Sequence, residues 1–99
     1  MQNYTISEIE MKGTDKQVSW ASDVRKNTLY AIYRAKNRDS NPVELNDHFG
    51  KTELNEKDFS AIEKFLPLIE KIDSAQYWIN NRKSGARKIF IDLHKGVVK

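Results

Sequence analysis

The sequence predicts a mainly α-helical domain of three or four helices packed around a long amphipathic helix near the N-terminus. A helix-start signal precedes a helical apolar stripe between residues 13 and 35, and later segments also place apolar residues three and four positions apart. The 99 residues suffice for one modest core, so we expect residues 1–99 to form a single domain. An α+β alternative adds a small two-stranded ribbon formed by the two ends.

The long helix is expected to begin at a capping box made by Thr14 and Gln17. One face then collects Val18, Ala21, Val24, Thr28, Leu29, Ile32 and Ala35. Arg25 falls inside this stripe, so its guanidinium either pairs or snorkels as a structural group or faces a partner. Tyr30 and Tyr33 point away from the centre of the stripe and are candidate contact residues.

A second, short helix is predicted over Pro42–Phe49. Asn41 is its expected cap, proline suits the first helical position, and Gly50 ends the helix. Val43 and either Leu45 or Phe49 are expected to face inward.

Two further helices follow from the same periodicity. The third is capped by Asn55 with Asp58 at its third position, and Pro67 predicts a kink or a new start. The fourth is expected to begin after Asp73 and to end near Lys83, because a serine and a glycine come next.

The two ends have an ambiguous pattern. Tyr4–Met11 alternates imperfectly and suits a short edge strand or an ordered arm. Ala86–His94 fits both a strand and a helix, and its β-branched and aromatic residues favour the strand. These two segments would pair as the ribbon, since a lone strand is not viable. The tail Val97–Lys99 is expected to fray.

Composition argues against several chemistries. The chain has no cysteine, and its two histidines, His48 and His94, lack the spacing of a metal site. It has neither a G-x-S-x-G elbow nor a phosphate-binding P-loop. We therefore expect no enzyme, no cofactor and no metal. The start lacks a signal-peptide layout and no apolar run approaches about 20 residues, so we expect a cytoplasmic protein without a membrane span.

Charge is distributed unevenly along the chain. Residues 1–39 carry seven basic and five acidic side chains, residues 40–73 four and eight, and residues 74–99 six and one. The net charge of +3 therefore combines +2, −4 and +5. This polarity suits a protein that places one end on an anionic surface, or a domain whose ends attract each other.

The most basic stretch contains four cations within seven residues: Arg82, Lys83, Arg87 and Lys88. No acidic residue occurs from Ser74 to Ile91. A flexible loop of this kind can follow a phosphate backbone, and the flanking Tyr77 and Phe90 can stack on bases if exposed. The alternatives are a rim that meets an acidic protein surface and a plain solvated loop.

Two motifs resemble a set of small proteins carried by phages and other bacterial mobile elements. The first is GTDKQVSWA at residues 13–21 with Val24 and Arg25 after it, and the second is SAQYWINNR at residues 74–82. The set pairs a TG-x-x-KQ-x-x-WA-x-x-I-R helix start with a later A-x-x-WI-x-x-R segment. This chain departs from the set at Val24 and at positions 76 and 77. The resemblance implies a genomic context and no catalytic residue.

Two functions compete on these grounds. The first is a non-enzymatic phage or mobile-element protein that binds and inhibits a host macromolecular complex, such as a nuclease-based defence system (anti-CRISPR-like). The second is a nucleic-acid-binding accessory protein that uses the basic 82–88 loop. A homodimer is compatible with both, because Tyr30, Tyr33 and Phe49 leave apolar surface outside a small core. Trp20 and Trp78 are expected to pack where two helix starts meet, with an exposed binding role as the alternative.

Overall fold

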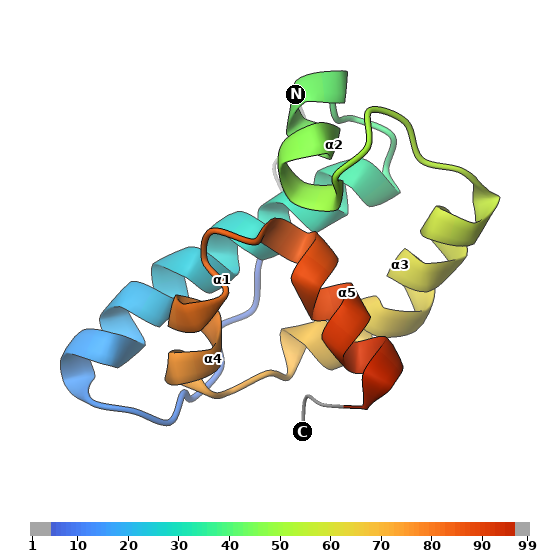
Figure 1. Cartoon of the computed structure of the whole chain (residues 1–99). Helices are drawn as coiled ribbons and strands as arrows, with labels where there is room; N and C mark the ends of the chain where they lie inside the picture. The colour runs from blue at the N-terminus through green and yellow to red at the C-terminus, as the bar shows by residue number, and fades with distance from the viewer. Residues whose placement is uncertain (1–4, 97–99) are drawn as a thin grey trace.

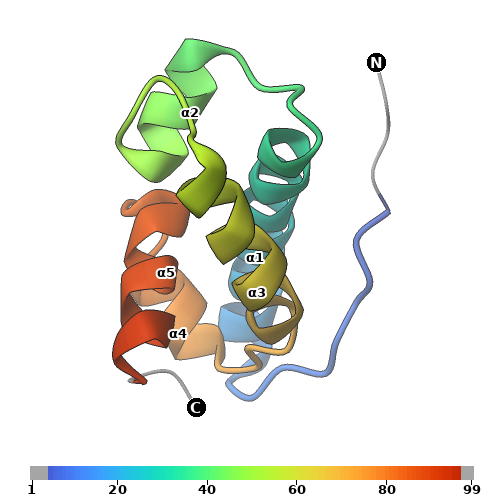
Figure 2. The ribbon, with the colours of Figure 1, turned by 90° about the vertical axis from the view of Figure 1, so that its right-hand side faces the viewer.

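The computed structural model describes residues 5–96, and these residues form five α-helices. The helices are α1 (Asp15–Lys36), α2 (Pro42–Phe49), α3 (Glu56–Glu70), α4 (Ala75–Asn80) and α5 (Gly85–Lys95). Helix α4 lies beside the N-terminal half of α1 (Figure 1). Helix α5 and the extended N-terminal arm lie on opposite sides of the α1–α3 pair (Figure 2). The prediction of a mainly α-helical chain is confirmed.

The caps predicted for the first two helices are confirmed. The Thr14 hydroxyl accepts the Gln17 N–H at 3.2 Å, and the Gln17 side chain accepts the Thr14 N–H at 3.0 Å. Asn41 caps α2 ahead of proline. The prediction for Val43 is wrong, because this side chain is 69% exposed. Leu45 and Phe49 are the α2 residues that pack against the core.

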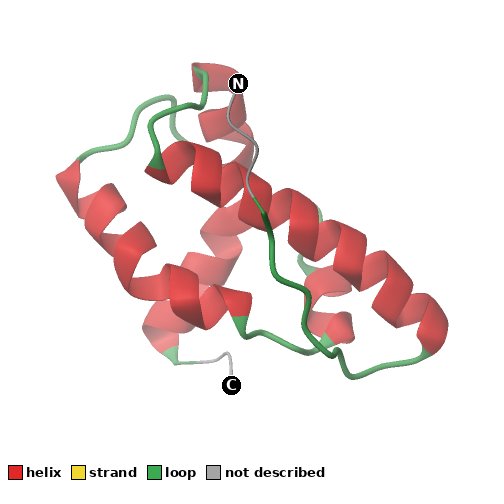
Figure 3. Cartoon of the chain, turned by 180° about the vertical axis from the view of Figure 1, so that it is seen from behind, coloured by secondary structure: helices red, strands yellow, loops and turns green. Residues whose placement is uncertain are grey.

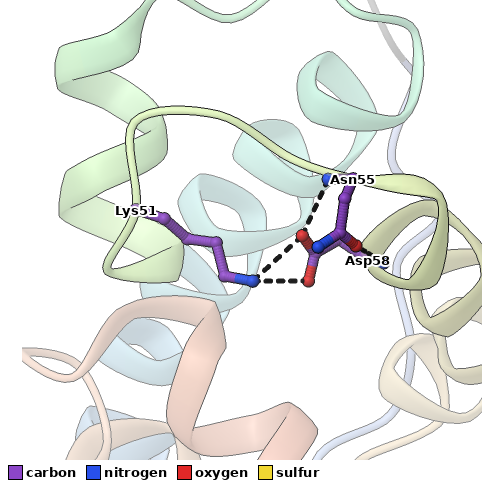
Figure 4. A network of polar contacts seen from close by, with 3 residues as sticks. All are labelled: Lys51, Asn55 and Asp58. Carbon is purple, nitrogen blue, oxygen red and sulfur yellow. Dashed lines mark hydrogen bonds and ion pairs between the residues drawn. The ribbon is translucent and has the colours of Figure 1, made fainter.

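Helix α3 has the predicted Asn55–Asp58 capping box, and Lys51 adds an ion pair to the same carboxylate (Figure 4). Pro67 lies inside α3, which continues to Glu70 without a new start. Helix α4 corrects the prediction at both ends. Ser74 caps it in place of Asp73, by accepting the Tyr77 N–H, and the helix ends at Asn80.

The strand predicted over Ala86–His94 is wrong, because this segment lies within α5. Ala86, Ile89 and Asp92 are all buried, and their three-residue spacing places them on one helical face. The terminal ribbon is also absent from residues 5–96, where the β-type pairing is a single isolated bridge between Lys12 and Ser74. Tyr4 and the tail Val97–Lys99 lie outside the described residues.

The two tryptophans have different environments. Trp78 is 1% exposed within the core, and its indole N–H donates to the Ile72 carbonyl at 3.0 Å. Trp20 is 49% exposed. The expectation that both indoles belong to the core is therefore right for Trp78 and wrong for Trp20.

Arg25 is buried and ties three segments together. Its guanidinium donates to the Ser7 carbonyl of the arm at 2.6 Å and to the Glu70 carbonyl of α3 at 2.9 Å. Burial lowers the pKa of Arg25, although the nearby Tyr33 and Glu70 act in the opposite direction. Arg25 is 3% exposed, so its inclusion among the candidate contact residues is corrected to a structural role.

Tyr33 belongs to the same group. Its hydroxyl donates to the Glu70 carboxylate at 2.7 Å. Burial, followed by this bond, raises the pKa of Tyr33 to about 12. The ring is half-buried against the core, so Tyr33 helps to join α1 to α3.

The start of α5 packs directly on the end of α2. Gly85 has a φ of +65°, and a Cβ atom there would lie 2.9 Å from the Asp47 carbonyl oxygen and 3.0 Å from His48 Cα. Both neighbours are backbone atoms, which cannot give way as a flexible side chain would. Glycine is therefore required at this position for its conformation and for the space.

We expect Gly85→Ala to lower the free energy of unfolding by about 2–5 kcal/mol, through left-handed strain and overpacking. Gly96→Ala is the matched control, because Gly96 has a φ of +73° with nothing within 4 Å of its added Cβ. We expect that control to cost only the strain, about 1–2 kcal/mol. Urea unfolding followed by tryptophan fluorescence measures both, and equal losses would contradict the close approach.

Candidate functional site

The four predicted cations form one exposed group, which we call the basic edge: Arg82, Lys83, Arg87 and Lys88. Arg82 and Lys83 lie in the turn between α4 and α5, whereas Arg87 and Lys88 belong to the first turns of α5. The expectation of a flexible loop over residues 82–88 is therefore corrected, because half of the segment is helical. Helix geometry fixes the backbone positions from which Arg87 and Lys88 project.

Arg82 is stacked on an exposed indole. Its guanidinium carbon lies 4.7 Å from the centre of the Trp20 ring, and its Nη1 donates to the Ile79 carbonyl at 2.7 Å. A cation over an indole face is attracted by the ring quadrupole, by about 0.5–1 kcal/mol at an exposed site. This Trp20–Arg82 pair presents an aromatic surface and a fixed positive charge side by side.

The pair exists because the starts of α1 and α4 are adjacent. The Gln17 side chain of α1 donates to the Gln76 side chain of α4 at 3.0 Å. One turn further along α1, Trp20 meets Arg82, which follows the last turn of α4. The two motifs quoted above therefore contact each other along this junction.

Lys88 is compensated by a buried acid. The Asp92 carboxylate, 5% exposed as a residue, accepts from Lys88 Nζ at 2.6 Å and from the Tyr77 hydroxyl at 2.7 Å. Burial acts to raise the pKa of Asp92, but the bonds from Lys88 and Tyr77 outweigh it and hold this pKa below its usual value. Burial and the same bond raise the pKa of Tyr77. The Tyr77 hydroxyl is therefore bound to Asp92, and the Tyr77 residue is half-buried.

The other three cations of the basic edge have no acidic side chain paired with them in the described part of the chain. Over residues 5–96, no carboxylate forms an ion pair with Arg82, Lys83 or Arg87. The acidic middle of the chain does not cover them, since all three are exposed. The basic edge thus presents three exposed positive charges that no described carboxylate neutralises.

The structure does not bring all the predicted residues together. Tyr77 lies beside the basic edge, but Arg25 binds the arm and Tyr33 binds α3. The arm runs across the face of the molecule that Figure 3 shows. Tyr30 is half-buried on α1. Sequence reasoning favoured the core for Trp20 and gave its exposure only as the alternative, and it missed the role of Asp92. The only signal was the position of Trp20 at the border of the apolar stripe.

Neither a metal site nor a membrane-spanning helix is found in the part of the chain that the structure covers. Between residues 5 and 96, histidine and acidic side chains do not gather in a group of three that could hold a metal ion. No helix in that range is both long and apolar enough to cross a membrane.

Comparison of the chain with family models, curated proteins and solved structures gives no match. The resemblance to mobile-element proteins therefore stays a prediction that rests on its two motifs.

We expect Asp92→Asn to lower the free energy of unfolding by about 1–3 kcal/mol at neutral pH, because two donors lose a charged acceptor. The folded pKa of Asp92 is depressed, so its stabilisation is present above the unfolded pKa of about 3.9 and is lost as the pH falls through the folded value. The difference between the two proteins should therefore shrink as the pH falls below about 4.

Urea unfolding at a series of pH values tests this prediction. Asp23→Asn, on the exposed side of α1, is the control and should change stability by less than about 0.5 kcal/mol. A difference that stays constant down to low pH would show that the Asp92 carboxylate is not the source of the effect.

Proposed function

We propose that this chain is a non-enzymatic binding protein that attaches to an acidic surface of a host macromolecular complex and inhibits it. Its contact surface is the Trp20–Arg82 pair together with Lys83 and Arg87. The observation that carries the proposal is the half-exposed indole of Trp20 beneath the Arg82 guanidinium.

Tryptophan and arginine are the residues most enriched among those that dominate binding energy at protein interfaces. Trp20 brings a large apolar area that is already fixed on a helix. Arg82 is held by a backbone carbonyl and by the indole, so it loses little side-chain freedom on binding. Such pre-organised groups bind a partner at a small entropic cost.

The inhibitory role and the phage-like context rest on the resemblance of the two motifs. Trp20 lies in the first motif and Arg82 closes the second, and these two residues contact each other. The part of the chain that resembles mobile-element proteins thus coincides with the proposed contact surface. A nuclease-based defence system, as targeted by anti-CRISPR proteins, is the class of partner we favour.

We expect Trp20→Ser and Arg82→Glu each to weaken partner binding by at least about tenfold, as loss of a dominant interface residue does. The tagged protein is first used to capture purified effector nucleases of bacterial defence systems. Affinity is then measured for each variant, and nuclease activity is measured with and without the chain. Lys57→Glu, an exposed charge reversal in the first turn of α3, is the control and should bind normally.

Failure of every tested nuclease to bind would remove the defence-system assignment. Equal losses in Arg82→Glu and Lys57→Glu would indicate a general charge effect, and normal binding by Trp20→Ser would exclude the Trp20–Arg82 pair as the contact surface.

The three uncompensated cations support a second candidate function, binding to a nucleic-acid backbone. If Arg82, Lys83 and Arg87 each contact a phosphate, the logarithm of the binding constant should fall with the logarithm of salt with a slope of about −2.7 for duplex DNA. Lys83→Gln should then make this slope less steep by about 0.9, because one phosphate contact is lost. Fluorescence anisotropy with labelled DNA across a salt series measures both, and salt-insensitive binding would exclude this function.

A further inference from the structure

A small hollow lies where the end of α2 meets α3 and α5. Its volume is about 160 Å³, and its wall is mainly apolar: Phe49, Ala61, Ile62, Phe90 and Ile91. The Phe90 ring packs against Phe49 in a tilted contact and against Phe65 edge to face, with ring centres 5.9 and 6.1 Å apart, so neighbouring rings hold this wall in place. Ile91 is 39% exposed at the surface, which leaves apolar surface for a ligand.

The size of the hollow indicates the size of its occupant. Pockets for whole drug-sized ligands measure about 300–1,000 Å³. An apolar cavity of about 150 Å³ holds one benzene ring. The hollow therefore suits a single aromatic or bulky apolar side chain, and it is too small for a complete cofactor.

Three charged residues line the hollow, Lys51, Asp58 and Arg87, and their net charge is positive. Lys51 Nζ donates to both oxygens of the Asp58 carboxylate, at 2.9 and 3.0 Å, and thereby compensates it (Figure 4). Arg87 also lines the hollow and has no such acid within residues 5–96. A Cβ atom at Gly50 would lie 3.2 Å from Arg87 Nη1 and 3.3 Å from its Cδ. The absence of a side chain at Gly50 thus gives Arg87 room along the end of α2.

We propose that this hollow binds a phenylalanine-like side chain from an acidic segment of a partner protein, with a neighbouring carboxylate of that segment bound by Arg87. The apolar wall would bury the aromatic side chain, and the unpaired guanidinium of Arg87 would favour a segment that carries a carboxylate. The inference deepens the proposed function, on which it rests for the identity of the partner. It adds a second contact site that is separate from the Trp20–Arg82 pair and that has its own ligand chemistry.

The test uses a short acetylated peptide with one phenylalanine between glutamates, titrated into the full, ¹⁵N-labelled chain. We expect saturable amide shifts at Ala61, Ile62, Arg87 and Phe90. A matched peptide with serine in place of phenylalanine should give no saturable shifts. A peptide with glutamines in place of the glutamates should bind at least about fivefold more weakly, because it lacks the charge that Arg87 selects.

Two variants with the same charge change separate the pocket from general attraction to positive charge. Arg87→Gln should weaken peptide binding at least about fivefold, whereas Lys16→Gln, at an exposed position in the first turn of α1, should change it less than about twofold. Ala61→Leu, which fills the hollow, should also abolish the saturable shifts. The amide spectrum of each variant reports directly whether it is folded.

Three outcomes would overturn the proposal. The first is the absence of saturable shifts at the lining residues, and the second is equal weakening by Arg87→Gln and Lys16→Gln. The third is a concentration-dependent dimer in sedimentation that Ile91→Glu dissociates. The last outcome would make a second copy of the chain the occupant. None of them depends on capture of a nuclease through the Trp20–Arg82 pair, so the two proposals can fail independently.

Discussion

A pair of backbone hydrogen bonds between Lys12 and residues 73–75 determines how the two motif-bearing helices meet. The Lys12 N–H donates to the Asp73 carbonyl at 2.8 Å, and the Ala75 N–H donates to the Lys12 carbonyl at 3.1 Å. The bonds lie immediately before α1 and at the start of α4, so they hold these helix starts side by side. Gly13 permits this approach, because a Cβ atom there would lie 3.0 Å from Ala75 Cβ. The contact between Trp20 and Arg82 follows from this alignment.

The other side of α1 is occupied by internal contacts. Arg25 holds the arm and α3 against it through two carbonyls, and Tyr33 adds a bond to Glu70. A buried guanidinium without such acceptors would be strongly destabilising. The polar groups of that face are therefore bonded within the domain, whereas the side of α4 and α5 carries exposed charge and the exposed indole of Trp20.

Local sequence patterns were enough to predict where the first three helices begin. Tertiary packing determined the features that could not be predicted. The caps at Thr14, Asn41 and Asn55 depend on residues within one turn, so short-range patterns identify them. Residues 86–94 satisfy two periodicities, and only packing against the core selects the helix. The composition of the basic edge could be predicted in the same local way. The exposure of Trp20 and the pairing of Lys88 with Asp92 could not, because both arise from contacts between helices.

The surroundings of the cations favour a protein partner over a phosphate backbone. The +5 charge of residues 74–99 overstates what is available, since Asp92 compensates Lys88. Of the remaining cations, Arg82 lies on an indole and Arg87 lines an apolar hollow. Contacts to a nucleic-acid backbone need charge but no apolar surface, and stacking on bases would need exposed rings along a groove. Cations set beside aromatic and aliphatic surface instead match the apolar centre and charged rim of a protein interface.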